Sequence, residues 1–319
     1  GTSMAGLDTF NLTDPDEDET YTGTYDRFVK QGVYTISIYA EDAKVSVGEP
    51  QTVTITQSAD LNECYFPHVA SNTRWKTEIA MINTSDQTLA GILVGYNALG
   101  CPVSTSLPVL LSGNGRKQVN VGKHFLNAQA IRYMVFYSDV SDVCGYTRFY
   151  EPGKYAVALP AVSDINTGDI YIPHIASNEK WWTGIGLVNT TPDEKTLTLA
   201  FNTGQTRDIT LSGGAHQSFN IKRLFGGPPQ EAIESAVIQN AEGVIGLELF
   251  CCDNQLSGVL LKDDTADTLY FPHVASNTKW WTGIAAYNPS SSMAELTITP
   301  YSETGNALDT ESEDLSTEE

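Results

Sequence analysis

The sequence has few basic residues: 18 Lys and Arg stand against 39 Asp and Glu, giving a net charge of −21. Proteins that bind nucleic acid or anionic membranes neutralise phosphate groups with clustered Lys and Arg. We therefore expect neither kind of partner. The sequence also lacks any apolar run of about 18 residues, the minimum for a bilayer-spanning helix, so we expect no membrane insertion.

Patterns typical of metal or nucleophilic chemistry are missing as well. The five cysteines and five histidines include no Cys-x-x-Cys pair and no Cys/His spacing typical of zinc sites. No grouping of Ser, His and Asp indicates nucleophilic catalysis. We therefore expect a protein that is not an enzyme. Cys101 and Cys144 lie in one repeat, where a disulfide between them is an option.

Strong helix formers are few, whereas Thr, Ser, Val, Ile, Tyr and Gly are common, which is typical of β structure. The only helical hint is a single turn near residues 229–235. The acidic charge gathers at the ends: residues 1–60 hold eleven acidic and three basic side chains, and residues 303–319 hold seven acidic and none basic. The middle of the chain therefore has an ordinary, mildly acidic surface.

One segment of 21 residues occurs three times, and it determines the architecture that we predict. It reads YFPHVASNTRWKTEIAMINTS from Tyr65, YIPHIASNEKWWTGIGLVNTT from Tyr171 and YFPHVASNTKWWTGIAAYNPS from Tyr270. The second and third copies agree at 13 of 21 positions, and the first and third at 15 of 21. Further along, CGYTRFY from Cys144 matches IGLELFC from Ile245. Self-similarity at a fixed period is the signature of a repeat protein.

Each repeat contains short segments in which apolar and polar residues alternate, as in LTLAF, where Leu197, Leu199 and Phe201 share one face. Gly100, Gly204 and Gly305 follow equivalent strands, and glycine permits the positive φ of a hairpin turn. We therefore predict an all-β protein of tandem immunoglobulin-like β-sandwich repeats. A β-propeller is the second choice, because propeller blades recur every 40–50 residues or so, whereas this segment recurs about every hundred residues.

The predicted boundaries follow from the repeat. The first repeat spans residues 60–163, the second 164–266 and a partial third 267–306, followed by an acidic flexible tail over 307–319. Residues 1–58 contain two alternating strands, at 34–39 and 51–56, and are predicted to be the C-terminal part of an immunoglobulin-like domain.

The repeat resembles a β-sandwich module of large secreted or surface proteins of bacteria. The matching residues are Phe66-Pro67-His68, Ile172-Pro173-His174 and Phe271-Pro272-His273, with the tryptophans that follow them. Residues 20–57 resemble the last hairpin of an immunoglobulin-like or cadherin-like domain. This resemblance implies an extracellular or cell-surface location and an accessory role in spacing, adhesion or anchoring. It carries no catalytic residues.

The candidate metal ligands are His68, His174 and His273, because neutral imidazole is a common metal ligand. One histidine per hundred residues does not make a cluster, so we interpret all three as structural. Seven residues after each histidine stands a tryptophan, and because neighbours on a strand point to opposite faces, we expect it to lie in the core. The core residues are Trp75, Trp181 and Trp280. The next position holds Lys76, Trp182 or Trp281, which we expect to face solvent, contact a neighbouring unit or partner, or stack on a sugar.

Acidic residues precede each motif, and calcium at unit junctions is one possible role for them. The residues concerned are Asp164, Asp169, Asp264 and Asp267. The ligand pattern is loose, and short acidic linkers are common. The Asp14–Asp18 run lacks the glycine and final glutamate of an EF-hand loop and is interpreted as a solvated turn.

The leading functional hypothesis is a non-enzymatic, extracellular structural or adhesion protein that acts through protein partners or self-association. A carbohydrate-binding module and the accessory region of a secreted hydrolase are the alternatives. A further hypothesis is a filament, in which the incomplete third repeat is completed by strands of another molecule.

Overall fold

The computed structural model describes residues 11–14, 16–18, 20–23, 25, 28, 30–40, 47–57, 60–103, 106–253, 255–290, 292–308 and 310–315. Strands make up 46% of the chain and helices 4%, in several antiparallel sheets, which confirms the prediction of an all-β protein. All five cysteines are free, so the optional bridge between Cys101 and Cys144 is not formed.

The first repeat folds into two four-stranded sheets that enclose a core. The sheet orders are β10-β9-β4-β7, here the outer sheet, and β3-β8-β5-β6, the inner sheet. The strands are β3 (Asn62–Phe66), β4 (Lys76–Asn83), β5 (Leu89–Tyr96), β6 (Leu107–Leu111), β7 (Arg116–Asn120), β8 (Tyr133–Ser138), β9 (Val143–Glu151) and β10 (Tyr155–Pro160). Phe66, Ile79 and Phe136 are among the fully buried residues between the sheets.

The second repeat has the same arrangement, with β15-β12-β17-β18 as its inner sheet and β11-β16-β13-β14 as its outer sheet. The strands are β11 (Ile170–Ile172), β12 (Trp181–Asn189), β13 (Lys195–Phe201), β14 (Thr206–Leu211), β15 (His216–Asn220), β16 (Ala236–Gln239), β17 (Val244–Cys252) and β18 (Gln255–Leu261). Leu197, Leu199 and Phe201 are all buried in its core, as their alternation in the sequence predicts.

The hairpin glycines adopt the predicted conformation. Gly100, Gly204 and Gly305 have φ values of +75°, +75° and +80°. A side chain at such a position is strained, and this explains why the three turns share glycine. The extra residues of the first repeat begin beside Gly100, and that loop contacts the second repeat: the backbone N–H of His216 donates to the carbonyl of Ala98 at 3.0 Å.

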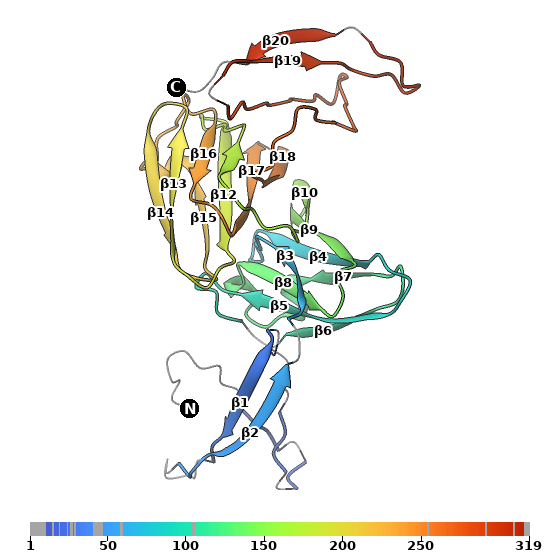
Figure 1. Cartoon of the computed structure of the whole chain (residues 1–319), viewed down its shortest axis with the longest axis vertical. Helices are drawn as coiled ribbons and strands as arrows, with labels where there is room; N and C mark the ends of the chain where they lie inside the picture. Colours follow the sequence, from blue (N-terminus) through green and yellow to red (C-terminus); the bar gives the residue numbers. More distant parts are fainter. Residues whose placement is uncertain are drawn as a thin grey trace.

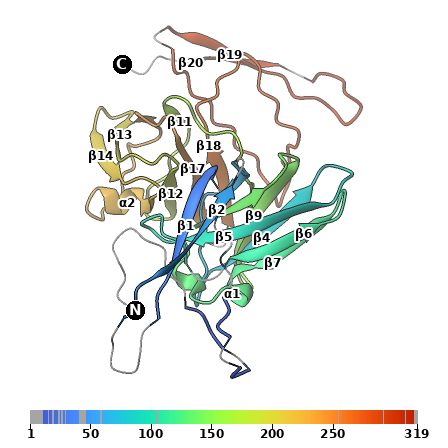
Figure 2. The ribbon, with the colours of Figure 1, turned by 60° about the horizontal axis from the view of Figure 1, so that its bottom comes forward.

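The two complete repeats pack directly against each other, with their strands running in different directions (Figure 1; a second view is given in Figure 2). The inner sheets face each other through an apolar cluster that includes Tyr65, Tyr133 and Tyr137 of the first repeat and Val188 and Ile245 of the second. The β9–β10 hairpin extends past its own inner sheet and packs directly on β17 and β18. The junction between the repeats is therefore a second, continuous apolar interior.

Helices are short, and the helical turn expected near residues 229–235 was wrong. The helical segments are α1 (Val121–His124), η1 (Ala128–Ala130) and α2 (Ile221–Leu224). Gly226 and Gly227 take positive φ directly after α2 and end it, so residues 229–235 continue without helix. In the part of the chain that is described, no helix has the length and apolar character needed to cross a membrane.

The N-terminal segment contributes one hairpin, β1 (Gly32–Ile38) with β2 (Gln51–Gln57), close to the two strands that the sequence predicts. The hairpin lies at one end of the molecule (blue in Figure 1). Val33 is 69% exposed and Val53 48% exposed, so its apolar side chains are largely uncovered.

The partial third repeat lies at the opposite end and has one hairpin, β19 (Ala294–Ile298) with β20 (Glu311–Leu315). Residues 311–315 of the segment that the sequence assigns to a tail form β20, which pairs with β19 as β14 pairs with β13. Residues 309 and 316–319 lie outside the described residues. Phe271 is 50% exposed, whereas the matching Phe66 and Ile172 are fully buried.

Candidate functional site

The polar residues of the repeated motif form the same hydrogen bonds in each copy. An asparagine Oδ1 accepts from two backbone N–H groups, those of the next residue but one and of the first tryptophan, which forms the turn before the strand. The three asparagines are Asn72, Asn178 and Asn277. A threonine hydroxyl then joins the N–H and the carbonyl of an alanine seven residues earlier. The threonines are Thr77, Thr183 and Thr282.

In every copy, the side chain of a second asparagine hydrogen-bonds to the backbone at the end of the strand. The Asn189 Nδ2 donates to the carbonyls of Asp193, Leu211 and Ser212, and its Oδ1 accepts from the N–H and hydroxyl of Thr191. Asn83 repeats all of these bonds in the first repeat, and Asn288 of the partial repeat forms the local ones. The motif therefore fixes turns and strand ends, which is a structural role.

Replacing Asn189 by Ala should lower the free energy of unfolding by about 2–3 kcal/mol, because three buried carbonyls lose their donor. Urea unfolding of the whole chain measures the loss. Asn288→Ala is the matched control and should cost less than about 0.5 kcal/mol, since its bonds are local and its surroundings are open. Equal losses in the two variants would contradict a structural role for the motif in the complete repeats.

The sheet β10-β9-β4-β7 of the first repeat is equivalent to β15-β12-β17-β18 of the second, but the outward faces of these two sheets differ in polarity. The difference follows what each face contacts. In the outer sheet of the first repeat this face is polar: the Arg148 guanidinium pairs with Glu78 at 3.0 Å, and the Glu78 carboxylate also accepts from Gln118 at 2.8 Å. The matching face of the second repeat is its inner sheet. There Lys76, Glu78, Tyr146 and Arg148 are replaced by Trp182, Gly184, Leu247 and Leu249.

This apolar face is covered by the first repeat. Leu247 and Leu249 pack with Phe149 and Leu159 of the β9–β10 hairpin, and Ile245 packs in the tyrosine cluster. Because the polar face is free and the apolar face is docked, each repeat is adapted to its place in the stack.

The tryptophan pairs lie at the junctions rather than in the cores. Trp75 and Trp182 are half-buried beside the same apolar cluster, and Trp181 contacts Trp281 of the partial repeat at 6.4 Å between ring centroids. The first tryptophan of one unit thus lies beside the second tryptophan of the next. Trp280 is 67% exposed, so its prediction as a core residue was wrong.

Trp75 lies just before β4 and Trp181 is the first residue of β12, so both lie at the end of a strand and not at its centre. There Trp75 packs on Tyr155 of the β9–β10 hairpin, and Trp181 packs on Trp281 of the next unit. Trp182 contacts the neighbouring unit, one of the roles that the sequence predicts for it, whereas Trp281 is 63% exposed.

Of the three motif histidines, one lies at the junction. His68 stacks on His216 of β15 with ring centroids 5.2 Å apart, and its Nδ1 lies 3.1 Å from the His216 Nε2, so one nitrogen donates to the other. Burial, together with the charge of Arg132, lowers the pKa of His68 to about 4 and that of His216 well below its usual value. Both imidazoles are therefore neutral at pH 7. His174 meets the edge of Phe250, and both it and His273 are exposed.

The aspartates considered for calcium do not gather. Asp169 accepts from the N–H of Asn240, and the carbonyl of Asp164 accepts from Lys262, while Asp264 and Asp267 are exposed. Within the described residues, the one group of three side chains close enough to share an ion is Asp14, Asp16 and Asp18, in an exposed acidic turn. The idea of calcium at the junctions therefore finds no shared site among these four residues.

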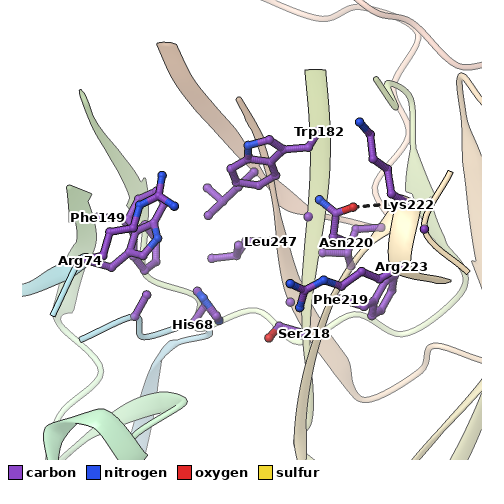
Figure 3. Close-up of a pocket in the computed structure, with 17 residues that line it drawn as sticks. His68, Arg74, Phe149, Trp182, Ser218, Phe219, Asn220, Lys222, Arg223 and Leu247 are labelled. Atoms are coloured by element: carbon purple, nitrogen blue, oxygen red, sulfur yellow. Dashed lines mark hydrogen bonds between the residues drawn. The ribbon is translucent and has the colours of Figure 1, made fainter. Parts of the chain in front are cut away.

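A cavity of about 860 Å³ opens between the two complete repeats (Figure 3). The first repeat contributes His68, Arg74, Trp75 and Phe149. The second contributes mainly Trp182, Phe219, Lys222, Arg223 and the glycines beside them. Comparison with family models, with curated proteins and with solved structures finds no match for this chain. The cavity is therefore interpreted from its own residues.

Sequence reasoning missed the second side of this cavity. Lys222 and Arg223 belong to a segment that varies between the repeats, where the first repeat has Gly122 and Lys123. The signal that was available is the replacement of Lys76 and Glu78 by Trp182 and Gly184, which marks the docked face.

Proposed function

We propose that the chain is a non-enzymatic structural and adhesion module of the cell surface, which acts through protein–protein contact or assembly. The observation that carries this proposal is the adaptation of each repeat to its neighbours. The same sheet is polar where it is free and apolar where it packs on another unit, so the chain is organised as a stack.

We also propose that the repeats are immunoglobulin-like β-sandwiches. In both repeats the second strand pairs with the fifth and the third with the sixth, as in the immunoglobulin order. The other strands depart from that order. The seventh strand pairs with the second, the first with the sixth and the fourth with the third. The module is thus a variant of the arrangement with eight strands.

The stack suits an accessory role. A stiff array holds its ends at a fixed separation, and the resemblance to modules of secreted and surface proteins of bacteria supports an extracellular location. The acidic surface keeps such a chain soluble.

Protease treatment of intact cells that make this protein tests the location. We expect proteinase K to remove the protein from intact cells while a cytosolic marker stays whole. Cells without the gene should attach to their usual surface at least about tenfold less well. Protection of the protein until lysis, or unchanged attachment, would contradict the proposal.

A further inference from the structure

The junction cavity has a charge opposite to that of the protein. Of its lining residues Arg74, Lys222 and Arg223 are cationic and none is acidic, in a chain with 39 Asp and Glu. Cations from two different repeats therefore converge on one cavity. Its volume lies within the range of about 300–1,000 Å³ typical of small-ligand pockets.

The cations are not equivalent. The Arg74 Nε donates to the Glu151 carboxylate at 2.6 Å, and its guanidinium also donates to the Tyr155 hydroxyl at 3.1 Å, so Arg74 is held by partners of its own repeat. For Lys222 and Arg223, no ion pair is found among the described residues. These two side chains supply the unbalanced positive charge.

Beside this charge lies a flat aromatic surface. The Trp182 indole lies along its own strand over Gly184, where an added Cβ would come within 3.1 Å of the ring. Glycine at this position therefore allows the indole to lie flat. Figure 3 shows Trp182 and Arg223 directed into the cavity from one side, with Arg74 and Phe149 on the other.

We propose that this cavity binds an acidic oligosaccharide, with a uronate carboxylate at Arg223 and the sugar ring against Trp182. The flat face of an indole matches the apolar C–H face of a sugar ring, and a guanidinium binds a carboxylate through two parallel hydrogen bonds. The Ser218 hydroxyl and the Asn220 amide line the same wall, and both can donate to sugar hydroxyls.

Trp281 of the partial repeat lies over Gly283 as Trp182 lies over Gly184, but none of the residues that line the cavity comes from the partial repeat. Binding therefore depends on the junction between the complete repeats, not on an exposed tryptophan alone.

Titration calorimetry of the whole chain with tetragalacturonate, with its methyl ester and with tetraglutamate tests the site. We expect the acid form to bind, the ester to bind at least about tenfold more weakly, and binding to weaken as salt is raised. Arg223→Gln should weaken binding at least about tenfold. Lys123→Gln is the matched control, since Lys123 occupies the same position in the first repeat, away from the cavity, and it should leave the affinity unchanged.

Equal binding of acid and ester would overturn the role of the charge, and binding of tetraglutamate alone would identify an acidic peptide instead. Absence of saturable binding to the acid form would overturn the proposal as a whole. Trp182→Phe, checked by urea unfolding, separates ring contact from stability of the junction. None of these outcomes bears on the stacking or location of the repeats.

Discussion

Replacing Ile245 by Asp should uncouple the two complete repeats and lower the free energy of unfolding by at least about 3 kcal/mol. Ile245 is 1% exposed and packs among the tyrosines of the first repeat. A carboxylate there loses its water and finds no cation in the cluster. Because the side chain points away from the core of its own repeat, that core should remain intact.

The expected result is two separate transitions in urea unfolding and a larger radius of gyration in X-ray scattering. The control is Cys144→Asp, at the matching position of the first repeat, where the side chain is exposed. That variant should cost less than about 0.5 kcal/mol. An unchanged scattering profile for Ile245→Asp would mean that the inner sheets do not hold the repeats together.

Much of the fold of a single repeat could be predicted because its signals are local. The alternation of Leu197, Leu199 and Phe201 gives a strand with one buried face, and the hairpin glycines give the turns. The asparagines and threonines of the motif recur because each one satisfies backbone groups within a few residues. These relations need no knowledge of a neighbouring unit.

The candidate site could not be predicted in the same way, because it depends on which sheets meet. Trp75 and Trp181 have the periodicity of core residues, yet they lie at the start of their strands, beside the junctions. His216 has no counterpart in the motif, although it stacks on His68. In the sequence, the contrast between Lys76 and Trp182 at matching positions is the signal that this face of the second repeat packs on another unit.

Glu248 should make the free energy of unfolding depend strongly on pH, which is the second large effect that we expect. Its carboxylate is fully buried on β17, and neither oxygen has a hydrogen-bond partner among the described residues. Burial raises its pKa to about 8. The matching residue of the first repeat is Thr147, which is also buried with its hydroxyl unpaired. The position therefore lies in a part of the sandwich that offers no partner to a polar group.

The folded protein should thus hold the Glu248 proton more tightly than the unfolded chain, whose Glu has a pKa near 4.5. Stability is full below that value and falls as the pH rises from about 4.5 to about 8. Replacing Glu248 by Leu should remove this pH-dependent loss, which amounts to about 4 kcal/mol between pH 4.5 and pH 8. Urea midpoints measured across this range test the slope.

Two variants separate charge from packing. Glu248→Gln should flatten the pH dependence without the full gain, since an unpaired amide stays buried, and the exposed Glu242→Gln should change neither.

On the acid side His68 acts in the opposite sense: its lowered pKa favours the neutral ring, so stability is full above pH 6.5 and falls as the pH drops toward 4. The wild-type profile should therefore peak between these two losses, and Glu248→Leu should keep only the acid limb. An alkaline limb that persists in Glu248→Leu would mean that another group carries it.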